Sequence, residues 1–213
     1  MTVLLVLAFF VTFLVIERFT NHDAEPTVRL QVASGVKPAV ASSVINGFRV
    51  PENLYYHQGH TWALNESPTL VRVGMDEFAA KAIGKMDSIS LPARNTWVRQ
   101  GQKFATVTRD GKTVNLISPI EGSVSDINEE AVKNPESARL DSFNEGWLVT
   151  VQAPDQKTNL RNLMHGSLAK AWMTASAESF HPALAQDGGE AVNDFLTVSG
   201  SDWEAEIKKV LIN

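Results

Sequence analysis

Residues 104–117 predict a β-hairpin, and this hairpin limits the folds that the chain can adopt. Phe104–Thr108 and Thr113–Ile117 alternate apolar and polar side chains, as half-buried strands do. Between them lies Asp110-Gly111, which is typical of a tight two-residue β-turn because glycine adopts positive φ at low cost. Further short alternating stretches lie at 70–73, 88–91 and 147–151. The sequence therefore predicts a small, mainly β domain.

Helices are expected at the edges of this domain and in the C-terminal part of the chain. Residues 76–84 favour a short helix that Asp76 caps and Gly84 ends. A second helix is expected at 158–173, where apolar residues share one stripe. Further on, we expect a short helix at 190–197 and a last helix that opens with a capping box at residues 201–204.

The last helix carries an apolar face, and such a face needs a surface to cover it. Its members are Trp203, Ile207, Val210 and Leu211. Two interpretations remain open. The helix packs back on its own domain, or it docks on another subunit, in which case these four residues bind the partner.

The amino-terminal residues predict a membrane anchor. Residues 2–16 contain no charge, and residues 1–19 are just long enough to cross a bilayer as a helix at about 1.5 Å per residue. A cleaved signal peptide usually begins with Lys or Arg, and none precedes the apolar run. A signal peptide and a buried core helix remain the alternatives. The nearby cations Arg18, Arg29 and Lys37 follow the segment, which favours a single-pass protein with its soluble domain on the cytoplasmic side.

The chain is therefore expected to have four parts: an anchor at 1–19, a tether at 20–49, a domain at 50–173 and a helical extension at 174–213. The net charge of −5 gives no basic field for nucleic acid. There is no cysteine, which excludes disulfides, thiolate metal sites and cysteine nucleophiles. We expect a bilayer and other protein subunits as partners, and no nucleic acid.

Other polar clusters have structural explanations. His57 and His60 form the sequence HQGH, which could share a metal, but no third ligand lies close by in the sequence. Asp76 is explained as a helix cap, and Glu129-Glu130 as a solvated helix face. No nucleophile–base pair, phosphate loop or nucleotide fingerprint occurs. We therefore expect no catalytic residues, no metal site and no enzyme activity.

Several motifs resemble one known family, the H protein of the glycine cleavage system. The resemblance covers about 110 residues and rests on Tyr56, His60-Thr61-Trp62, VGMDEFAAKAIGKMDSISLP, GQKFATV, ISPIEGSVSDINEEAVKNPE and NEGWLVTVQAPD. It implies a flattened β-sandwich of the lipoyl/biotinyl carrier type, a barrel-sandwich hybrid, with helices at its edges. In that fold a hairpin tip presents one lysine, to which lipoate is attached through an amide.

The sequence departs from this family at the hairpin. The modified lysine of such carriers usually lies eight residues before the proline that follows, and eight residues before Pro119 is Gly111. Lys112 is only seven residues before it, and a slip of one residue redirects a strand side chain. Lys112 is therefore either an ordinary lysine beside a turn or a lipoylated lysine in a shifted hairpin.

The main hypothesis is a non-catalytic, membrane-anchored accessory subunit of a membrane complex, such as a respiratory or other electron-transfer complex, without a cofactor. The alternative is a membrane-tethered carrier with lipoate bound covalently to Lys112. A third hypothesis is an adaptor that brings glycine-cleavage partners to the membrane and carries nothing.

Overall fold

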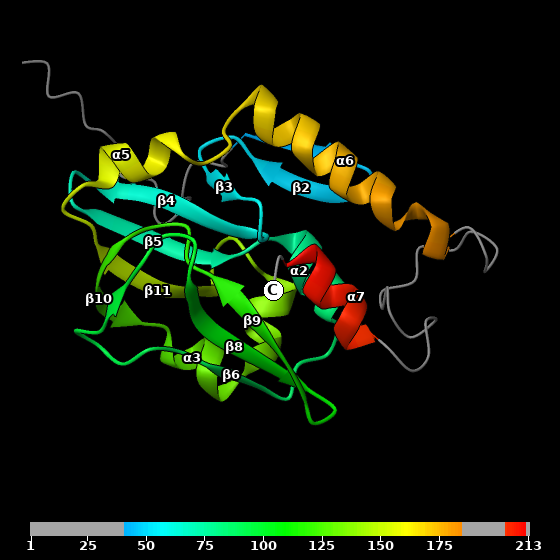
Figure 1. Cartoon of the computed structure of the whole chain (residues 1–213), viewed down its shortest axis with the longest axis horizontal. Coiled ribbons are helices and arrows are strands. Elements are labelled where there is room, and N and C mark those ends of the chain that lie inside the picture. Colours follow the sequence, from blue (N-terminus) through cyan, green and yellow to red (C-terminus); the bar gives the residue numbers. More distant parts are fainter. Residues whose placement is uncertain (1–40, 185–202, 212–213) are drawn as a thin grey trace, which may run out of the picture. The chain divides into compact units, whose positions relative to one another are not determined.

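The computed structural model describes residues 41–184 and 203–211 (Figure 1). The expected anchor at 1–19 and the helix expected at 190–197 lie outside these residues. In the part of the chain that is described, no helix is both long and apolar enough to cross a membrane.

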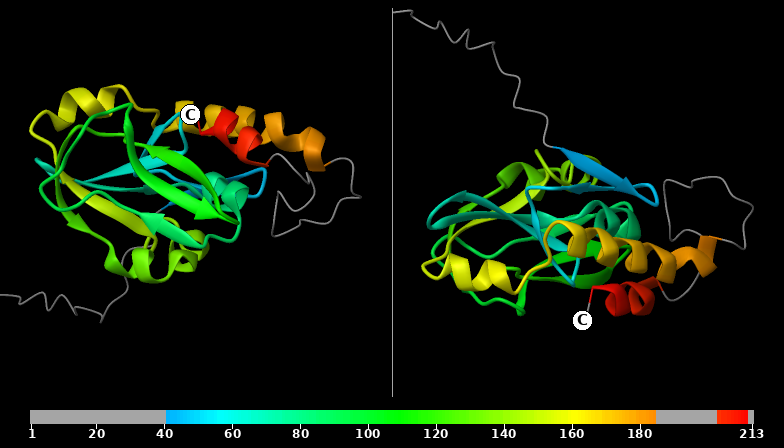
Figure 2. Two further views of the ribbon diagram at one scale, coloured as in Figure 1. Left: turned by 60° about the horizontal axis from the view of Figure 1, so that its bottom comes forward. Right: turned by 90° about the horizontal axis from the view of Figure 1, so that it is seen from above.

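Two antiparallel sheets form the body of the domain. The larger has the strand order β3-β4-β5-β11-β10-β7 and the smaller the order β6-β8-β9. The larger sheet consists of β3 (Tyr55–His57), β4 (Thr61–Ser67), β5 (Leu70–Met75), β11 (Trp147–Gln152), β10 (Gly122–Ile127) and β7 (Trp97–Val98). The smaller consists of β6 (Ser88–Ser90), β8 (Lys103–Arg109) and β9 (Lys112–Ile117). The two lie in separate layers around one apolar core (Figure 2), so the mainly β expectation is confirmed.

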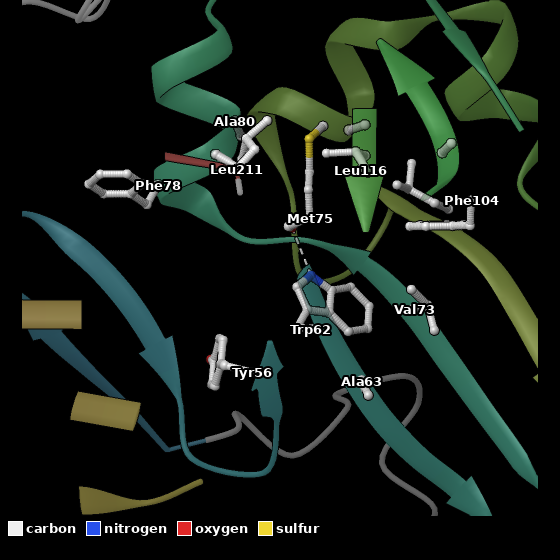
Figure 3. Packing of buried hydrophobic residues seen from close by; sticks show 14 of the residues in the cluster. Tyr56, Trp62, Ala63, Val73, Met75, Phe78, Ala80, Phe104, Leu116 and Leu211 are labelled. Atoms are coloured by element: carbon white, nitrogen blue, oxygen red, sulfur yellow. Dashed lines mark hydrogen bonds between the residues drawn. The ribbon is translucent and has the colours of Figure 1, made fainter. Parts of the chain in front are cut away.

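Trp62 lies near the centre of this core and has no exposed surface (Figure 3). Its indole Nε1 donates hydrogen bonds to the carbonyl oxygens of Met75, at 2.8 Å, and Ser142, at 3.0 Å. The ring lies against Gly74 so closely that a Cβ at that position would overlap it. Trp62 therefore ties the strand pair β4–β5 to the loop that leads into β11.

The first helix agrees with its prediction. In α2 (Glu77–Ile83), the side chain of Asp76 accepts a hydrogen bond from the Ala79 amide, and Gly84 ends the helix at φ 74°. Two further short helices follow β10, α3 (Glu129–Lys133) and α4 (Pro135–Leu140).

The helix expected at 158–173 is instead two helices, α5 (Gln156–Arg161) and α6 (Ser167–Leu184). Between them the backbone of Met164 exchanges two hydrogen bonds of 2.8 Å with Tyr56. Gly166 has φ 59°, a conformation that also interrupts a helix. A long-range bridge therefore breaks a segment whose apolar stripe reads as continuous, and α6 continues beyond the expected boundary at 173.

Residues 42–51 also differ from the prediction, because they form two strands where part of a tether at 20–49 was expected. They form a hairpin of β1 (Ser42–Ile45) and β2 (Phe48–Pro51), and its turn residues Asn46 and Gly47 have φ 48° and 83°. The side chains of Phe48 and Val50 are buried in the core. The folded domain therefore begins before residue 50, and the rest of the expected tether lies outside the described residues.

Candidate functional site

The tip of the β8–β9 hairpin is the first candidate site, because a carrier domain would present its lysine there. Arg109 pairs with Lys112 in the strand register, so Asp110 and Gly111 are the two turn residues. Their φ angles are 50° and 73°, as a tight turn of this type requires. The Asp110 amide also donates a 2.6 Å hydrogen bond to the Asp87 carboxylate. The predicted two-residue turn is confirmed, and its outermost residues are Asp110 and Gly111.

Lys112 is the first residue of β9 and lies in the strand ladder. Successive strand side chains alternate between faces, so Lys112 shares a face with Val114 and Leu116. Both of those side chains are fully buried, so this face looks toward the core. On the same face of β8, the Arg109 guanidinium donates a 2.6 Å hydrogen bond to the Ile83 carbonyl at the end of α2. The half-buried Lys112 therefore extends toward the inner side of the smaller sheet.

The C-terminal helix α7 (Trp203–Val210) packs against β9, the strand that begins at Lys112 (Figure 1). On α7, a hydrogen bond from Lys208 lowers the pKa of Glu204, and the charges of Lys208 and Lys112 lower it further. Lys112 is therefore within electrostatic reach of α7. This neighbour lies far along the chain, and no pattern around residue 112 identifies it.

Two residues of the predicted apolar face of α7 are core residues. Ile207 and Leu211 have no exposed surface, and both belong to the same apolar cluster as Phe78 and Ala80 of α2 (Figure 3). These two side chains thus agree with the interpretation in which the helix packs on its own domain, and they offer no surface to a partner. The side chains of Trp203 and Val210 are outside the described part of the structure, so their partner role stays a prediction.

The two histidines of HQGH point to different neighbours. His57 Nδ1 accepts a 3.0 Å hydrogen bond from the Gly59 amide, and burial lowers the pKa of this imidazole. His60 Nδ1 lies 2.8 Å from the Asp76 carboxylate, and both side chains are buried. Among the described residues, no group of three His, Cys, Asp or Glu side chains could hold a metal ion. Sequence reasoning missed the contact between His60 and Asp76, because the two residues meet only through the fold.

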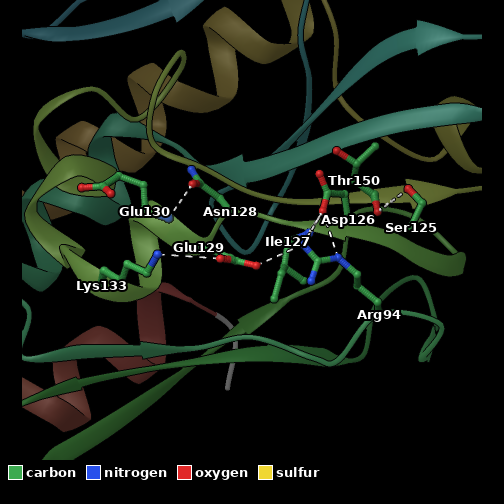
Figure 4. Close-up of polar contacts among 9 residues, drawn as sticks. All are labelled: Arg94, Ser125, Asp126, Ile127, Asn128, Glu129, Glu130, Lys133 and Thr150. Carbon is green, nitrogen blue, oxygen red and sulfur yellow. Dashed lines mark hydrogen bonds and ion pairs between the residues drawn. The ribbon is translucent and has the colours of Figure 1, made fainter.

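The remaining acidic candidates lie on the surface or cap helices. Arg94 bridges Asp126 at 2.9 Å and Glu129 at 3.3 Å, and Glu129 lies 3.7 Å from Lys133 (Figure 4). The hydrogen bond from Arg94 lowers the pKa of Asp126. Glu129 and Glu130 are exposed, as the sequence predicts for a solvated helix face.

Asn128 caps α3 and connects this helix to the start of β11. Its side-chain oxygen accepts hydrogen bonds from the amides of Glu130 and Ala131 (the first is drawn in Figure 4). Its amide nitrogen donates 2.7 Å hydrogen bonds to the carbonyls of Glu145 and Trp147. This buried residue is structural, and it holds α3 beside β11.

Comparison with known proteins gives a consistent result. The family model described as "Glycine cleavage H-protein" matches residues 54–176. The glycine cleavage system H protein of Anaeromyxobacter sp. (strain K) is 32% identical over 124 residues, which are 58% of this chain and 95% of that protein. The H protein of Pseudoalteromonas translucida is 32% identical over 116 residues, 54% of this chain and 89% of that protein.

A solved structure of an H protein is also similar. The crystal structure of the glycine cleavage system H protein from Mycobacterium marinum is 28% identical and covers 49% of this chain and 87% of that chain, with a TM-score of 0.46. The family match extends over more than half of the 213 residues and contains both the hairpin and the His60-Thr61-Trp62 motif. The chain therefore belongs to the glycine cleavage H-protein family.

Proposed function

We propose that this chain is a membrane-anchored, non-catalytic member of the H-protein family that serves as an accessory subunit of a membrane complex and carries no lipoyl group. One observation supports the absence of a lipoyl group. The outermost residues of the carrier hairpin are Asp110 and Gly111, while Lys112 lies in the ladder and extends toward the core side.

The argument concerns access. A lysine that is to be acylated must enter the active site of a ligase, and a carrier lysine must then enter the active sites of its partner enzymes. An exposed hairpin tip suits this task, because the chain on both sides of it leaves the lysine clear. The backbone of Lys112 is held opposite Arg109, and its side chain shares a face with the buried Val114 and Leu116. This position suits a structural lysine.

The alternative, a carrier that uses Lys112 and covalent lipoate, has one observation in its favour. Lys112 directly follows the turn and is only half-buried, so a local opening of the hairpin would bring it to the surface. The two functions differ in a covalent modification, which can be measured directly.

The decisive measurement is the intact mass of the full chain purified from its native membrane, followed by peptide mapping of residues 103–125. We expect Lys112 to be unmodified. A lipoyl adduct that is present in the wild type and absent in Lys112→Arg would overturn the proposal and establish the carrier function.

A second variant tests the structural reason. Gly111→Lys returns a lysine to the tip, where a Cβ meets no atom within 4 Å. Its φ of 73° makes the substitution cost about 1 kcal/mol, which a folded domain tolerates. Incubated with a lipoate ligase, ATP and lipoate, Gly111→Lys should gain the lipoyl mass, whereas wild type and Lys112→Arg should not. Equal modification of wild type and Gly111→Lys would show that access does not distinguish the two positions.

Membrane anchoring and partner binding are separate parts of the proposal. Deletion of residues 1–19 should release the protein from membranes that retain the full chain after an alkaline wash. Trp203→Ala should lower the recovery of co-purifying subunits and leave the midpoint of urea unfolding unchanged. Unchanged recovery would remove α7 from the proposed interface.

A further inference from the structure

A hollow of about 330 Å³ is lined by residues of α2, α6, α7 and the turn between β3 and β4. Its volume is at the lower end of the range for small-molecule sites, about 300–1,000 Å³. Such sites combine apolar walls with a few placed polar groups. Here the apolar surface comes from Phe78, Met164 and Trp172, and polar groups come from Gln58, His60 and Ser176. The hollow therefore has the composition of a ligand site.

His60 is fixed at this hollow by its own backbone. Its φ of 57° lies in the left-handed region, which residues other than glycine seldom adopt. Its amide donates a 3.0 Å hydrogen bond to the His57 carbonyl, and its carbonyl accepts a 3.0 Å hydrogen bond from the Asp76 amide. Only 2% of the residue is exposed. The imidazole is thus placed by the fold and does not have to be ordered by a ligand.

The contact with Asp76 decides what the other nitrogen of His60 can do. Nδ1 lies 2.8 Å from one oxygen of the buried Asp76 carboxylate, whose other oxygen accepts the Ala79 amide hydrogen bond. A carboxylate accepts hydrogen bonds, so the proton of the neutral ring lies on Nδ1. The lone pair is then on Nε2. Nε2 of His60 is therefore an acceptor, and it requires a donor.

The described residues supply no donor to this nitrogen. Within 41–184 and 203–211, no group lies at hydrogen-bond distance from Nε2 of His60. The polar side-chain atoms of these residues that are sealed from solvent without a partner are Nε of Arg72 and Oε1 of Glu136. Nε2 is not one of them, so it retains some exposed surface. Because His60 lines the hollow, this acceptor is open to a molecule that enters there.

The surroundings of Nε2 indicate the chemistry of that molecule. The ring centroids of Phe78 and Trp172 lie 4.3 Å and 4.6 Å from the imidazole of His60, so an apolar ring would meet aromatic surface. A hydroxyl group donates one hydrogen bond to Nε2 and can still accept one from Gln58 or Ser176. A carboxylate has no proton to donate and would place its charge against the lone pair.

We propose that this hollow binds a small neutral aryl alcohol, a molecule with a hydroxyl group and an aromatic ring. The hydroxyl donates to Nε2 of His60, and the ring packs on Trp172 and Met164. The proposal goes beyond the function proposed above and does not depend on whether Lys112 carries a group.

The test uses the full chain in lipid nanodiscs and matched pairs of probes. Benzyl alcohol is compared with benzyl methyl ether, and phenol with anisole. NMR spectra of protein with ¹⁵N-labelled histidines report the protonation of each ring nitrogen, and the His60 signals are identified by their loss in His60→Asn. The free protein should carry the His60 proton on Nδ1. Both alcohols should then shift the Nε2 signal in a saturable way, with a dissociation constant on the order of 1 mM for ligands of this size.

The ethers measure the hydrogen bond to Nε2. They should bind about ten-fold more weakly than the alcohols, because they cover a buried acceptor and give it no donor. Asparagine tolerates positive φ but has no atom at the position of Nε2. In His60→Asn, alcohol and ether should therefore bind with equal affinity, as followed by tryptophan fluorescence.

A second variant keeps the test valid if His60→Asn does not fold. Ser176→Leu adds apolar volume to a residue that lines the hollow, so it should weaken the binding of both alcohols about ten-fold. The matched control is Ala175→Leu, at an exposed position of α6 that does not line the hollow, and it should leave the affinity unchanged. The proposal is overturned if the free ring carries a proton on Nε2, if ethers and alcohols bind the wild type equally, or if Ser176→Leu binds as the wild type does.

Discussion

The strongest structural prediction concerns Leu211, which follows α7 and is fully buried. Leu211→Ala removes three carbon atoms from the apolar core, to which Phe78 and Ala80 of α2 also belong. Leucine-to-alanine changes at buried sites cost about 2–5 kcal/mol. Leu211 lies next to the end of α7, where the chain can relax into part of the cavity, so we expect the lower part of this range, about 2–3 kcal/mol. With a urea m-value of about 2 kcal/mol/M, the midpoint of unfolding should fall by roughly 1–1.5 M.

The matched control is Leu168→Ala, the same chemical change on α6 at a residue that is 60% exposed. It should change the stability by less than about 0.5 kcal/mol. The assay is urea unfolding of the full chain in a mild detergent, followed by tryptophan fluorescence. If both variants shift the midpoint equally, α7 is not part of the core. The interpretation in which this helix docks on another subunit would then be favoured.

Three further results are expected. Asn128→Ala should lower the free energy of unfolding by about 2–4 kcal/mol, because it removes a helix cap and leaves the carbonyls of Glu145 and Trp147 without their donor. The control Asn144→Ala, at an exposed site, should lower it far less. Gly74→Ala should also destabilise the domain, by about 1–3 kcal/mol, because the new Cβ overlaps the buried indole of Trp62. Thermal unfolding measures the loss of stability in both the Asn128 and the Gly74 variant. Burial, and then the charge of Asp76, raises the pKa of the Tyr56 phenol. Its neutral form therefore stabilises the fold below the unfolded pKa, and this contribution is lost as pH rises. In an absorbance titration, Tyr56 should ionise only when the protein unfolds in alkali, and Tyr56→Phe should remove that step.

Local sequence signals predicted the elements that depend on local chemistry. Asp110-Gly111 has the turn that the dipeptide favours, and α2 begins and ends at the residues that cap it. The same rule, applied to Asn46-Gly47, would have identified the β1–β2 hairpin. The strands beside that turn are short, and their burial depends on contacts of β1 and β2 with α2 and α6, so the surrounding Ser- and Pro-containing segment favoured a tether instead.

By itself, the sequence determined the mainly β fold and the two-residue turn, and its motifs indicated the family. The fold and the turn follow from strand alternation and φ preferences, which act over a few residues, whereas the family was indicated by the resemblance of several motifs. Only the tertiary structure decided which residues each strand or helix face contacts. It placed Ile207 and Leu211 in the core, turned Lys112 toward the inner side of the smaller sheet, and brought His60 against Asp76 and Trp172. An apolar stripe or a lone histidine specifies that a neighbour is needed, but its identity depends on packing between segments far apart in the chain.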